Sequence, residues 1–139
     1  MSDKTLMLIK PRAVQNNCNG MILDQVNKAG FRIAGMKMIH LTKKQAQEFY
    51  SIHKERPFFE DLVSFMTSGP IVAAMIKKEN AVEDFRNLIG PTNPEEAEEG
   101  TIREMCGYDI QQNAVHGSDS DENAERESNF FFPYFERFA

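Results

Sequence analysis

The chain has 139 residues, of which 41% are hydrophobic and 27% are charged, and its formal net charge is −5. This balance is typical of a globular protein, and the length suits a single domain over residues 1–139 with a hydrophobic core of its own. The acidic balance argues against a nonspecific nucleic-acid binder, because phosphate neutralisation supplies most of that affinity.

Hydrophobic periodicity and turn residues predict the order β, α, β, α, α, β, α, loop, β, α. Strands are expected over 5–9, 31–41 with a kink near Gly35, 71–76 and 113–116, and helices over 21–28, 43–51, 56–66, 81–89 and 120–131. A single capped turn is expected at 93–96, and residues 101–112 are predicted to form a long ordered loop. Four strands divided by helices in this way indicate an α+β, ferredoxin-like split βαβ fold, with a four-stranded antiparallel sheet covered by helices on one face.

The sequence shows no recognisable targeting signal and has few cysteines, which predicts a cytoplasmic protein. The apolar runs over 6–9 and 71–76 are too short for a secretory signal or a membrane span. Cys18 and Cys106 are too few for a disulfide framework and are expected to be two reduced thiols. The aromatic tail over 130–138 is too apolar for a free linker, so it should pack on the body or on another subunit.

The segment over 113–120, with the sequence NAVHGSDS, sets a single histidine between an apolar run and small polar residues. An imidazole can attack without losing a proton to a separate base, provided that an acceptor holds its other nitrogen. Gly117 lets a bulky group approach closely, and Ser120 is a suitable helix cap. His116 is therefore a candidate nucleophile, and a satisfied core histidine is the alternative.

Six motifs in register resemble the nucleoside diphosphate kinase family and cover almost the whole chain. They are Asn113-x-x-His116-Gly117-Ser118-Asp119-Ser120, Ile9-Lys10-Pro11, Arg56-Pro57-Phe58-Phe59, Met66-Thr67-Ser68-Gly69-Pro70, Gly90-x-Thr92-Asn93-Pro94 and Gly100-Thr101-Ile102-Arg103. The resemblance implies transfer of the γ-phosphate of a nucleoside triphosphate, usually ATP, to a nucleoside diphosphate. The reaction would be ping-pong through a phosphohistidine on His116. The short chain looks more like the bacterial members.

The resemblance also implies a role for each matching residue. Ser118 and Glu127 would support His116, and Asn113 would hold the sugar hydroxyl. Phosphate would be bound by Lys10, Tyr50, Arg86, Thr92 and Arg103, of which the arginines suit phosphate because the planar guanidinium binds two oxygens at once. Surface ion pairs are the alternative for the arginines, a solvated charge for Glu127 and for Lys10, and core packing for Tyr50.

Phe58 matches the base-stacking aromatic of the family, with Leu62 and Ile110 as apolar walls; core packing is the alternative for Phe58 and is the reading for Phe59. Stacking tolerates every base, so base specificity should be broad. The sequence has no cluster with metal-ligand spacing, and the Mg²⁺ that the resemblance implies would be carried by the nucleotide phosphates. The family also implies a homo-oligomer, either a tetramer or a hexamer.

Two departures from the family pattern stand out. Arg12 and Ala13 replace the usual Asp-Gly after Lys-Pro, and Glu104 and Met105 replace the usual Gly-Asp after the loop arginine. The added cation near the site could change nucleotide affinity or an ion pair between segments. Two other functions compete with the kinase: a catalytically silent nucleotide-binding or regulatory module of the same fold, and a ferredoxin-like RNA-binding domain, which the acidic charge disfavours.

Overall fold

The computed structural model describes residues 3–110 and 112–138. The strands are β1 (Lys4–Ile9), β2 (Arg32–Ile39), β3 (Ile71–Lys77) and β4 (Val115–Gly117). The α-helices are α1 (Pro11–Gln15), α2 (Asn19–Lys28), α3 (Lys43–Phe49), α4 (Phe59–Met66), α5 (Ala81–Ile89), α6 (Ile102–Cys106) and α7 (Asp121–Phe131). Short 3₁₀ helices are η1 (Ser51–His53), η2 (Pro94–Glu96) and η3 (Tyr134–Glu136). None of the helices in the described part of the chain is long and apolar enough to cross a membrane.

The four strands form one antiparallel sheet in the order β2-β3-β1-β4. This confirms the predicted four-stranded antiparallel sheet of an α+β fold. The predicted kink near Gly35 is also confirmed, because the register between β2 and β3 shifts between Ile33 and Gly35. The two central strands, β1 and β3, are apolar almost throughout and are buried along nearly all of their length.

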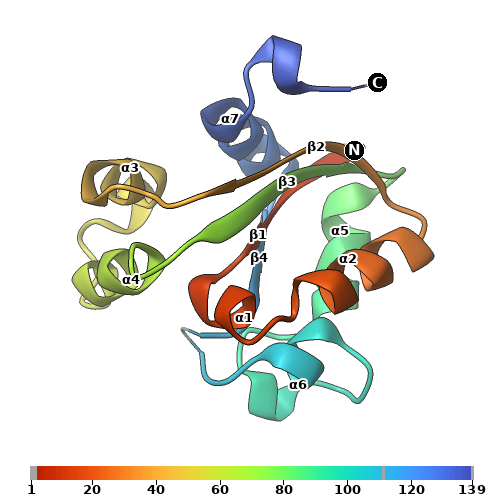
Figure 1. Cartoon of the computed structure of the whole chain (residues 1–139), viewed down its shortest axis with the longest axis horizontal. Helices are drawn as coiled ribbons and strands as arrows, with labels where there is room; N and C mark the ends of the chain where they lie inside the picture. Colours follow the sequence, from red (N-terminus) through yellow and green to blue (C-terminus); the bar gives the residue numbers. More distant parts are fainter. Residues whose placement is uncertain (1–2, 111, 139) are drawn as a thin grey trace.

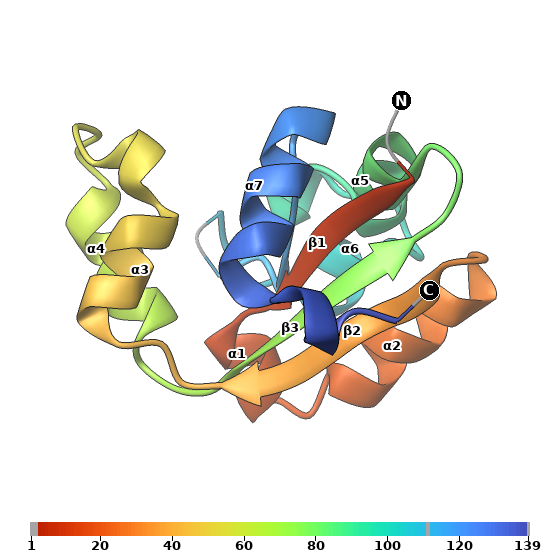
Figure 2. The same cartoon turned by 90° about the horizontal axis from the view of Figure 1, so that it is seen from above.

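Both faces of the sheet are covered, so the prediction of helices on one face is wrong. Met7 and Ile9 of β1 pack with residues of α1, α2, α5 and α6. Leu6 and Leu8 point the other way and pack with residues of α3, α4 and α7. Figures 1 and 2 show these two layers, with α3 and α4 projecting beyond one end of the sheet. The uninterrupted apolar run in β1 was the sequence signal, since a strand with one wet face alternates with polar residues.

Two short helices were not predicted. The expected loop over 101–112 contains α6, where the Thr101 side chain accepts a hydrogen bond from the Glu104 amide. Immediately after β1, Pro11 occupies the first turn of α1. Five residues are too few for a hydrophobic period to show, so the only sequence signals were the capping threonine and the proline at the first turn.

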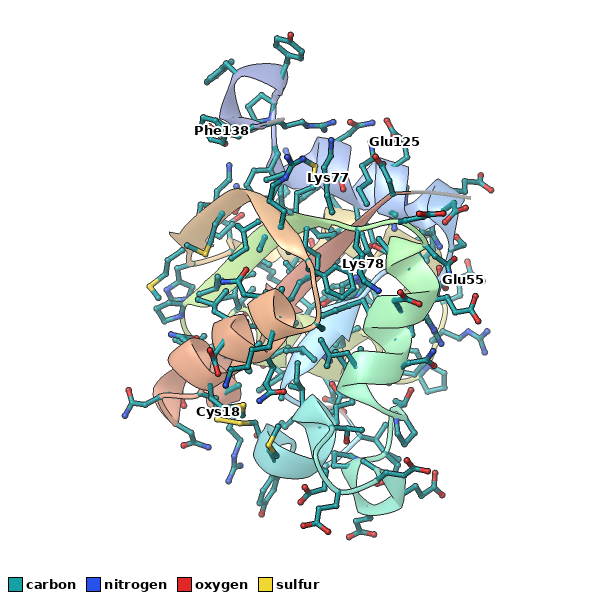
Figure 3. The ribbon with its side chains drawn as sticks, turned by 90° about the vertical axis from the view of Figure 1, so that its right-hand side faces the viewer. Cys18, Glu55, Lys77, Lys78, Glu125 and Phe138 are labelled. Carbon is teal, nitrogen blue, oxygen red and sulfur yellow. A yellow bond between two sulfur atoms is a disulfide. The ribbon has the colours of Figure 1, made fainter. Side chains whose placement is uncertain are left out.

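Cys18 and Cys106 form a disulfide, with 6.6 Å between their Cα atoms, so the prediction of two reduced thiols is wrong for this structure. Figure 3 shows the bond, which joins the residue before α2 to the last residue of α6. The two residues are 88 positions apart in sequence, so their pairing could not be read from local spacing. The bond thereby connects α6 to the N-terminal part of the chain, just before α2.

The aromatic tail divides into two parts. Phe131 and Phe132 are buried in the core on the α7 face of the sheet. Tyr134, Phe135 and Phe138 follow them and are exposed. The second part nevertheless contacts β2, because the Phe138 amide donates to the Ala34 carbonyl over 2.7 Å and Glu136 pairs with Lys37 over 2.6 Å. The whole tail therefore packs on the body, with these three aromatic rings left exposed.

Candidate active site

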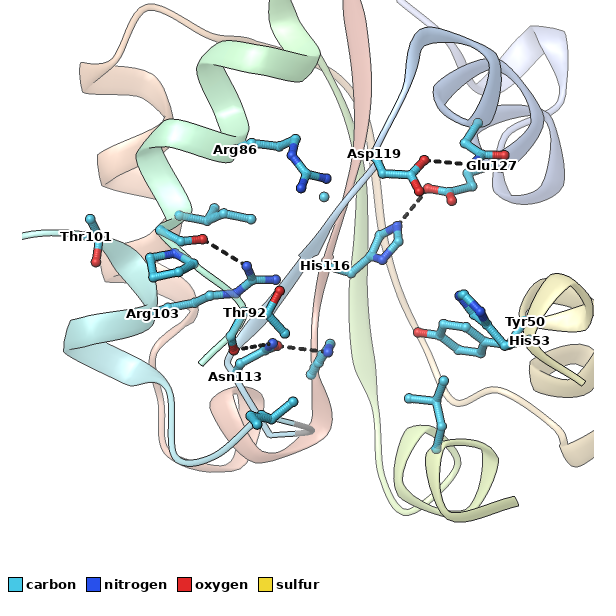
Figure 4. A pocket seen from close by; sticks show the side chains of 18 of the residues that line it. Tyr50, His53, Arg86, Thr92, Thr101, Arg103, Asn113, His116, Asp119 and Glu127 are labelled. Atoms are coloured by element: carbon cyan, nitrogen blue, oxygen red, sulfur yellow. Dashed lines mark hydrogen bonds and ion pairs between the residues drawn. The ribbon is translucent and has the colours of Figure 1, made fainter. Parts of the chain in front are cut away.

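An open cavity of about 1290 Å³ lies between the α3–α4 side and the α5–α6 side of the molecule (Figure 4). It brings together eleven of the twelve predicted site residues: Lys10, Tyr50, Phe58, Leu62, Arg86, Thr92, Arg103, Ile110, Asn113, His116 and Glu127. The twelfth, Ser118, is fully buried and hydrogen bonds to Glu127. Residues from six segments of the chain thus meet in one place.

His116 lies on β4, opposite Leu8 of the buried strand β1. Its Nε2 atom is 2.7 Å from Glu127 Oε1, and Figure 4 shows the ring beside the cavity with Glu127 on its far side. The phenyl ring of Phe49 packs edge-on against the imidazole, with 5.6 Å between the ring centroids. The bonded nitrogen is thus occupied by the carboxylate, and Nδ1 is the ring nitrogen left for chemistry.

Glu127 is a buried carboxylate on α7, with a relative exposure of 4%. Burial acts to raise its pKa, but hydrogen bonds from His116 and Ser118 and the charges of His116 and Arg126 outweigh burial and lower the pKa. The carboxylate is therefore ionised at neutral pH and accepts a hydrogen bond from the Nε2–H group of His116. Ser118 donates to the same oxygen, Oε1, over 2.8 Å, so the carboxylate has a fixed orientation.

Lys10 follows β1 directly and is 8% exposed. Its ammonium donates to Asn113 Oδ1 over 2.9 Å, and Asn113 donates through Nδ2 to the Thr92 carbonyl over 3.0 Å. Burial, and then the charge of Arg103, lower the pKa of Lys10 to about 7, while Asp109 acts to raise it. An anion entering the cavity would favour the charged form of this lysine.

Arg103 is held by two backbone carbonyls. Its Nη1 atom donates to the Gly90 carbonyl over 2.9 Å and its Nη2 atom donates to the Val115 carbonyl over 3.0 Å. Burial, and then the charge of Arg86, lower the pKa of Arg103 to about 10, so it stays charged at neutral pH. Two guanidinium groups that face one cavity repel each other, and an anion between them would relieve that repulsion.

Two hydroxyls complete the polar side of the cavity. The Tyr50 hydroxyl is buried and has no hydrogen-bond partner within the described residues, and Figure 4 shows it pointing into the cavity toward His116. Burial, and then the charge of Glu127, raise the pKa of Tyr50, so the phenol remains a donor. Thr92 lies on the opposite wall, beside Asn113 and Arg103. An unpaired buried donor suits a ligand with acceptor oxygens.

The apolar mouth of the cavity is formed by Phe58, Leu62 and Ile110. Phe58 is 46% exposed and Ile110 is 61% exposed, which is unusual for large apolar side chains that serve only to pack. The His53 ring lies 5.6 Å from the Phe58 ring between centroids. Phe59, by contrast, packs against the core as predicted.

A strained turn precedes His116. Ala114 has a φ of 75° and is almost fully buried, and the Val115 amide donates back to the Asn113 carbonyl over 2.9 Å. A three-residue turn of this kind is rare, and a positive φ at a residue other than glycine costs about 1–3 kcal/mol. The turn separates Asn113, which faces Lys10, from the start of β4. Alanine at this position carries no sequence signal for such a turn.

Arg126 and Asp119 line the cavity but were not among the predicted site residues. Arg126 places Nη2 3.6 Å from Glu127 Oε2, and its Cζ lies 5.8 Å from the centroid of the Phe49 ring. Asp119 faces the cavity beside Arg86 in Figure 4 and accepts a hydrogen bond from Asn123 over 2.6 Å. A cation beside a glutamate on an acidic helix resembles an ordinary surface pair, so the sequence could not single out Arg126.

No group of three or more His, Cys, Asp or Glu side chains suited to a metal ion occurs among residues 3–110 and 112–138. Mg²⁺ keeps several waters and is usually bound by one or two carboxylates together with substrate phosphates. The exposed carboxylate of Asp119, beside the cations of the cavity, suits that mode of binding better than a cage of protein ligands.

Comparisons with known proteins agree with this geometry. The family model described as nucleoside diphosphate kinase matches residues 3–137. The chain is 52% identical to the nucleoside diphosphate kinase of Persephonella marina over 96% of both chains, and 53% identical to that of Flavobacterium psychrophilum over 99% of both. The crystal structure of the Aquifex aeolicus nucleoside diphosphate kinase superposes with a TM-score of 0.96 at 44% identity, covering 97% of this chain and 98% of that one. The structure of a halophilic nucleoside diphosphate kinase from Halobacterium salinarum in complex with CDP superposes with a TM-score of 0.94 at 35% identity. The match covers 100% of this chain and 93% of that one.

Proposed function

The chain belongs to the nucleoside diphosphate kinase family and has that phosphotransferase activity, and we propose that His116 carries the phosphoryl group between its two substrates. In the first half-reaction, a lone pair of His116 attacks the γ-phosphorus of a nucleoside triphosphate. A nitrogen–phosphorus bond forms, the bond to the β-phosphate oxygen breaks, and the diphosphate leaves with the electron pair. The second half-reaction reverses these steps on another nucleoside diphosphate, so the reaction is ping-pong.

The attacking atom in this proposal is Nδ1. The proposal is supported by the 2.7 Å contact between His116 Nε2 and Glu127, which leaves Nδ1 without its proton and beside the cavity. Phosphorylation makes the imidazole ring cationic, and the Glu127 carboxylate stabilises that charge. Ser118 keeps the carboxylate in place throughout.

The cations of the cavity neutralise the phosphate oxygens. Arg86 and Arg103 bind the transferring group and its neighbour, and Lys10 reaches the same group from the end of β1. Tyr50 and Thr92 donate hydroxyl hydrogen bonds. This assignment is supported by the common cavity, by the mutual repulsion of the two arginines and by the unpaired Tyr50 hydroxyl.

The base and sugar occupy the outer part of the cavity. Phe58 stacks on the base, Leu62 and Ile110 flank it, and Asn113 with Lys10 binds the ribose hydroxyl. The exposure of Phe58 and Ile110 supports this role, since ligand binding would cover both. Contacts of this kind read the face of the base and not its hydrogen-bonding edge, so purines and pyrimidines should both be substrates and the enzyme would maintain the pools of all the nucleoside triphosphates.

Mg²⁺ is the usual cofactor of such kinases, and we propose that it arrives on the phosphates of the nucleotide. Bound there, with Asp119 as the cavity carboxylate that would help to hold it, the ion would neutralise negative charge on the phosphate oxygens. ATP, the most abundant triphosphate in cells, would be the usual donor, and the cytoplasm is the compartment where both substrates are found.

We also propose a homo-oligomer, either a tetramer or a hexamer. Strand β2 is an edge of the sheet, and Met36 and Met38 on it are 52% and 58% exposed. Phe135 and Phe138 in the tail are exposed as well. The Phe138 amide already donates to the Ala34 carbonyl of β2, so a second copy would cover the exposed apolar side chains of the strand and the tail together. Light scattering of the purified protein would give the mass of the assembly.

The observation that carries the proposal is the carboxylate-held imidazole beside three cations. The test is to incubate the protein with γ-labelled ATP and Mg²⁺, isolate it, and add an unlabelled nucleoside diphosphate. We expect an acid-labile label that moves to the diphosphate, and no label on His116→Gly. His40→Gln is the matched control, because His40 is exposed and contacts the Thr67 carbonyl. Equal labelling of His116→Gly, or no labelling of the unmodified protein, would overturn the mechanism. Neither the silent module nor the RNA-binding domain has an observation in its favour.

A further inference from the structure

Arg12 makes contacts that none of the proposed catalytic roles explains. It lies on α1, directly after Lys10 and Pro11. Its guanidinium lies over the ring of Tyr108, with 3.5 Å from Cζ to the ring centroid. Its Nη1 atom also donates to Gln112 Oε1 over 3.0 Å. The arginine that departs from the family motif therefore binds two residues about a hundred positions away.

Those two residues are the ends of one loop. The Tyr108 amide donates to the Gln112 carbonyl over 2.8 Å. Asp109 Oδ1 accepts from the Gln112 amide over 2.7 Å. Ile110, which forms one wall of the cavity mouth, belongs to this loop. Arg12 thus contacts both ends of this loop, which contains Ile110, one side of the proposed base site.

This loop has little other support from apolar packing. Tyr108, Asp109 and Ile110 are all exposed, and Tyr108 retains 60% of its surface. A stacked guanidinium limits the tilt of the tyrosine ring, and the hydrogen bond to Gln112 limits movement of the other end of the loop. Lysine could not make both contacts, because it lacks the planar group.

We propose that Arg12 is a positioning residue that sets the Ile110 wall, so that it governs binding of the base and leaves phosphoryl transfer unchanged. The proposal rests on the proposed kinase function. Without Arg12 the loop would sample positions in which Ile110 no longer meets the base. The wall would then contribute less to nucleotide binding, while His116 and the phosphate-binding cations would keep their places.

The test compares a nucleotide with a substrate that has no base. Single-turnover phosphorylation of the protein is measured with labelled ATP and with ribose 5-triphosphate, over a range of concentrations. For Arg12→Ala we expect the half-saturating ATP concentration to rise about 5- to 10-fold, the saturating rate to be unchanged, and ribose 5-triphosphate to behave as with the unmodified protein. Tyr108→Leu should act in the same direction, and Arg12→Lys should give an intermediate value.

Arg32→Ala is the matched control, because Arg32 is an exposed arginine at the start of β2, away from the cavity. Thermal melting checks that each variant is folded. If Arg12→Ala does not fold, Tyr108→Leu tests the same loop. Equal losses with both substrates, or no loss with ATP, would overturn the proposal. Absence of protein phosphorylation by either substrate in the unmodified protein would instead refute the kinase mechanism, so the two failures are distinguishable.

Discussion

Reduction of the Cys18–Cys106 disulfide should lower the stability of the protein by an amount that the chain separation sets. The two cysteines are 88 positions apart. In the chain-entropy model, a bond that closes a loop of this length removes about 15 cal/mol/K from the unfolded chain, or about 4.6 kcal/mol at 25 °C. This is a large fraction of the 5–15 kcal/mol that is typical of a folded domain.

Urea unfolding with and without a phosphine reductant measures the change. With a urea dependence of about 2 kcal/mol/M, the midpoint should fall by about 2 M. Protein concentration is held constant, because assembly also adds to apparent stability. Titration of free thiols should find none before reduction and two after it.

The Cys18→Ser/Cys106→Ser double variant is the matched control. It should unfold like the reduced protein and should not respond to the reductant. A reduced protein whose midpoint stays within about 0.5 M of that of the oxidised protein would refute the reasoning. Free thiols in the protein as purified would show that the bond does not form under those conditions.

Four substitutions test the site and its support. Glu127→Gln should slow protein phosphorylation by roughly 100-fold at saturating ATP, because a neutral amide cannot stabilise the imidazolium; stopped-time labelling measures the rate. Burial, and then the charge of Arg103, lower the pKa of Lys10 to about 7, so the charged form is lost as pH rises through 7. The KM for ATP should therefore rise by up to about tenfold per pH unit above that value. The Lys10→Gln variant should not show this rise in KM. Gly117→Ala would bring a Cβ within 2.8 Å of the buried Phe85 ring and should destabilise the fold by about 1–3 kcal/mol in thermal melts. Gly20→Ala, in a helix with nothing within 4 Å, should instead add up to about 1 kcal/mol. An unaltered labelling rate, a flat KM profile, or equal melting of the two alanine variants would contradict the respective argument.

The elements that the sequence predicted well have long patterns or strong punctuation. β2 has the kink expected at Gly35, and α7 begins after Ser120, whose hydroxyl accepts from the Asn123 amide as a cap. α1 and α6 were missed because five residues do not complete two turns of a helix. Local pattern is therefore informative only over segments longer than the period it has to show.

The residues that line the cavity were predictable as a set, because motifs fix residue types at fixed positions along the chain. What the motifs could not supply is the relation between segments. The Cys18–Cys106 bond and the contact of Arg12 with Tyr108 both depend on how distant parts of the chain pack. The positive φ of Ala114 is a similar case, because alanine carries no signal for that conformation. Tertiary structure decides all three.

The two hydrogen bonds of Ser118 link the thermal stability of the active site to that of the central sheet. The Ser118 hydroxyl donates to Glu127 and also accepts a hydrogen bond from the Leu6 amide over 3.2 Å. This side-chain bond extends the short backbone pairing between β4 and β1 by one hydrogen bond. A three-residue edge strand would otherwise fray early, but this one is fastened to a strand whose residues 6–9 have no exposure to solvent. The imidazole should therefore keep its position up to the temperature at which the sheet itself melts. Thermal motion will widen the outer cavity, where Phe58 and Ile110 lie, well before it displaces His116.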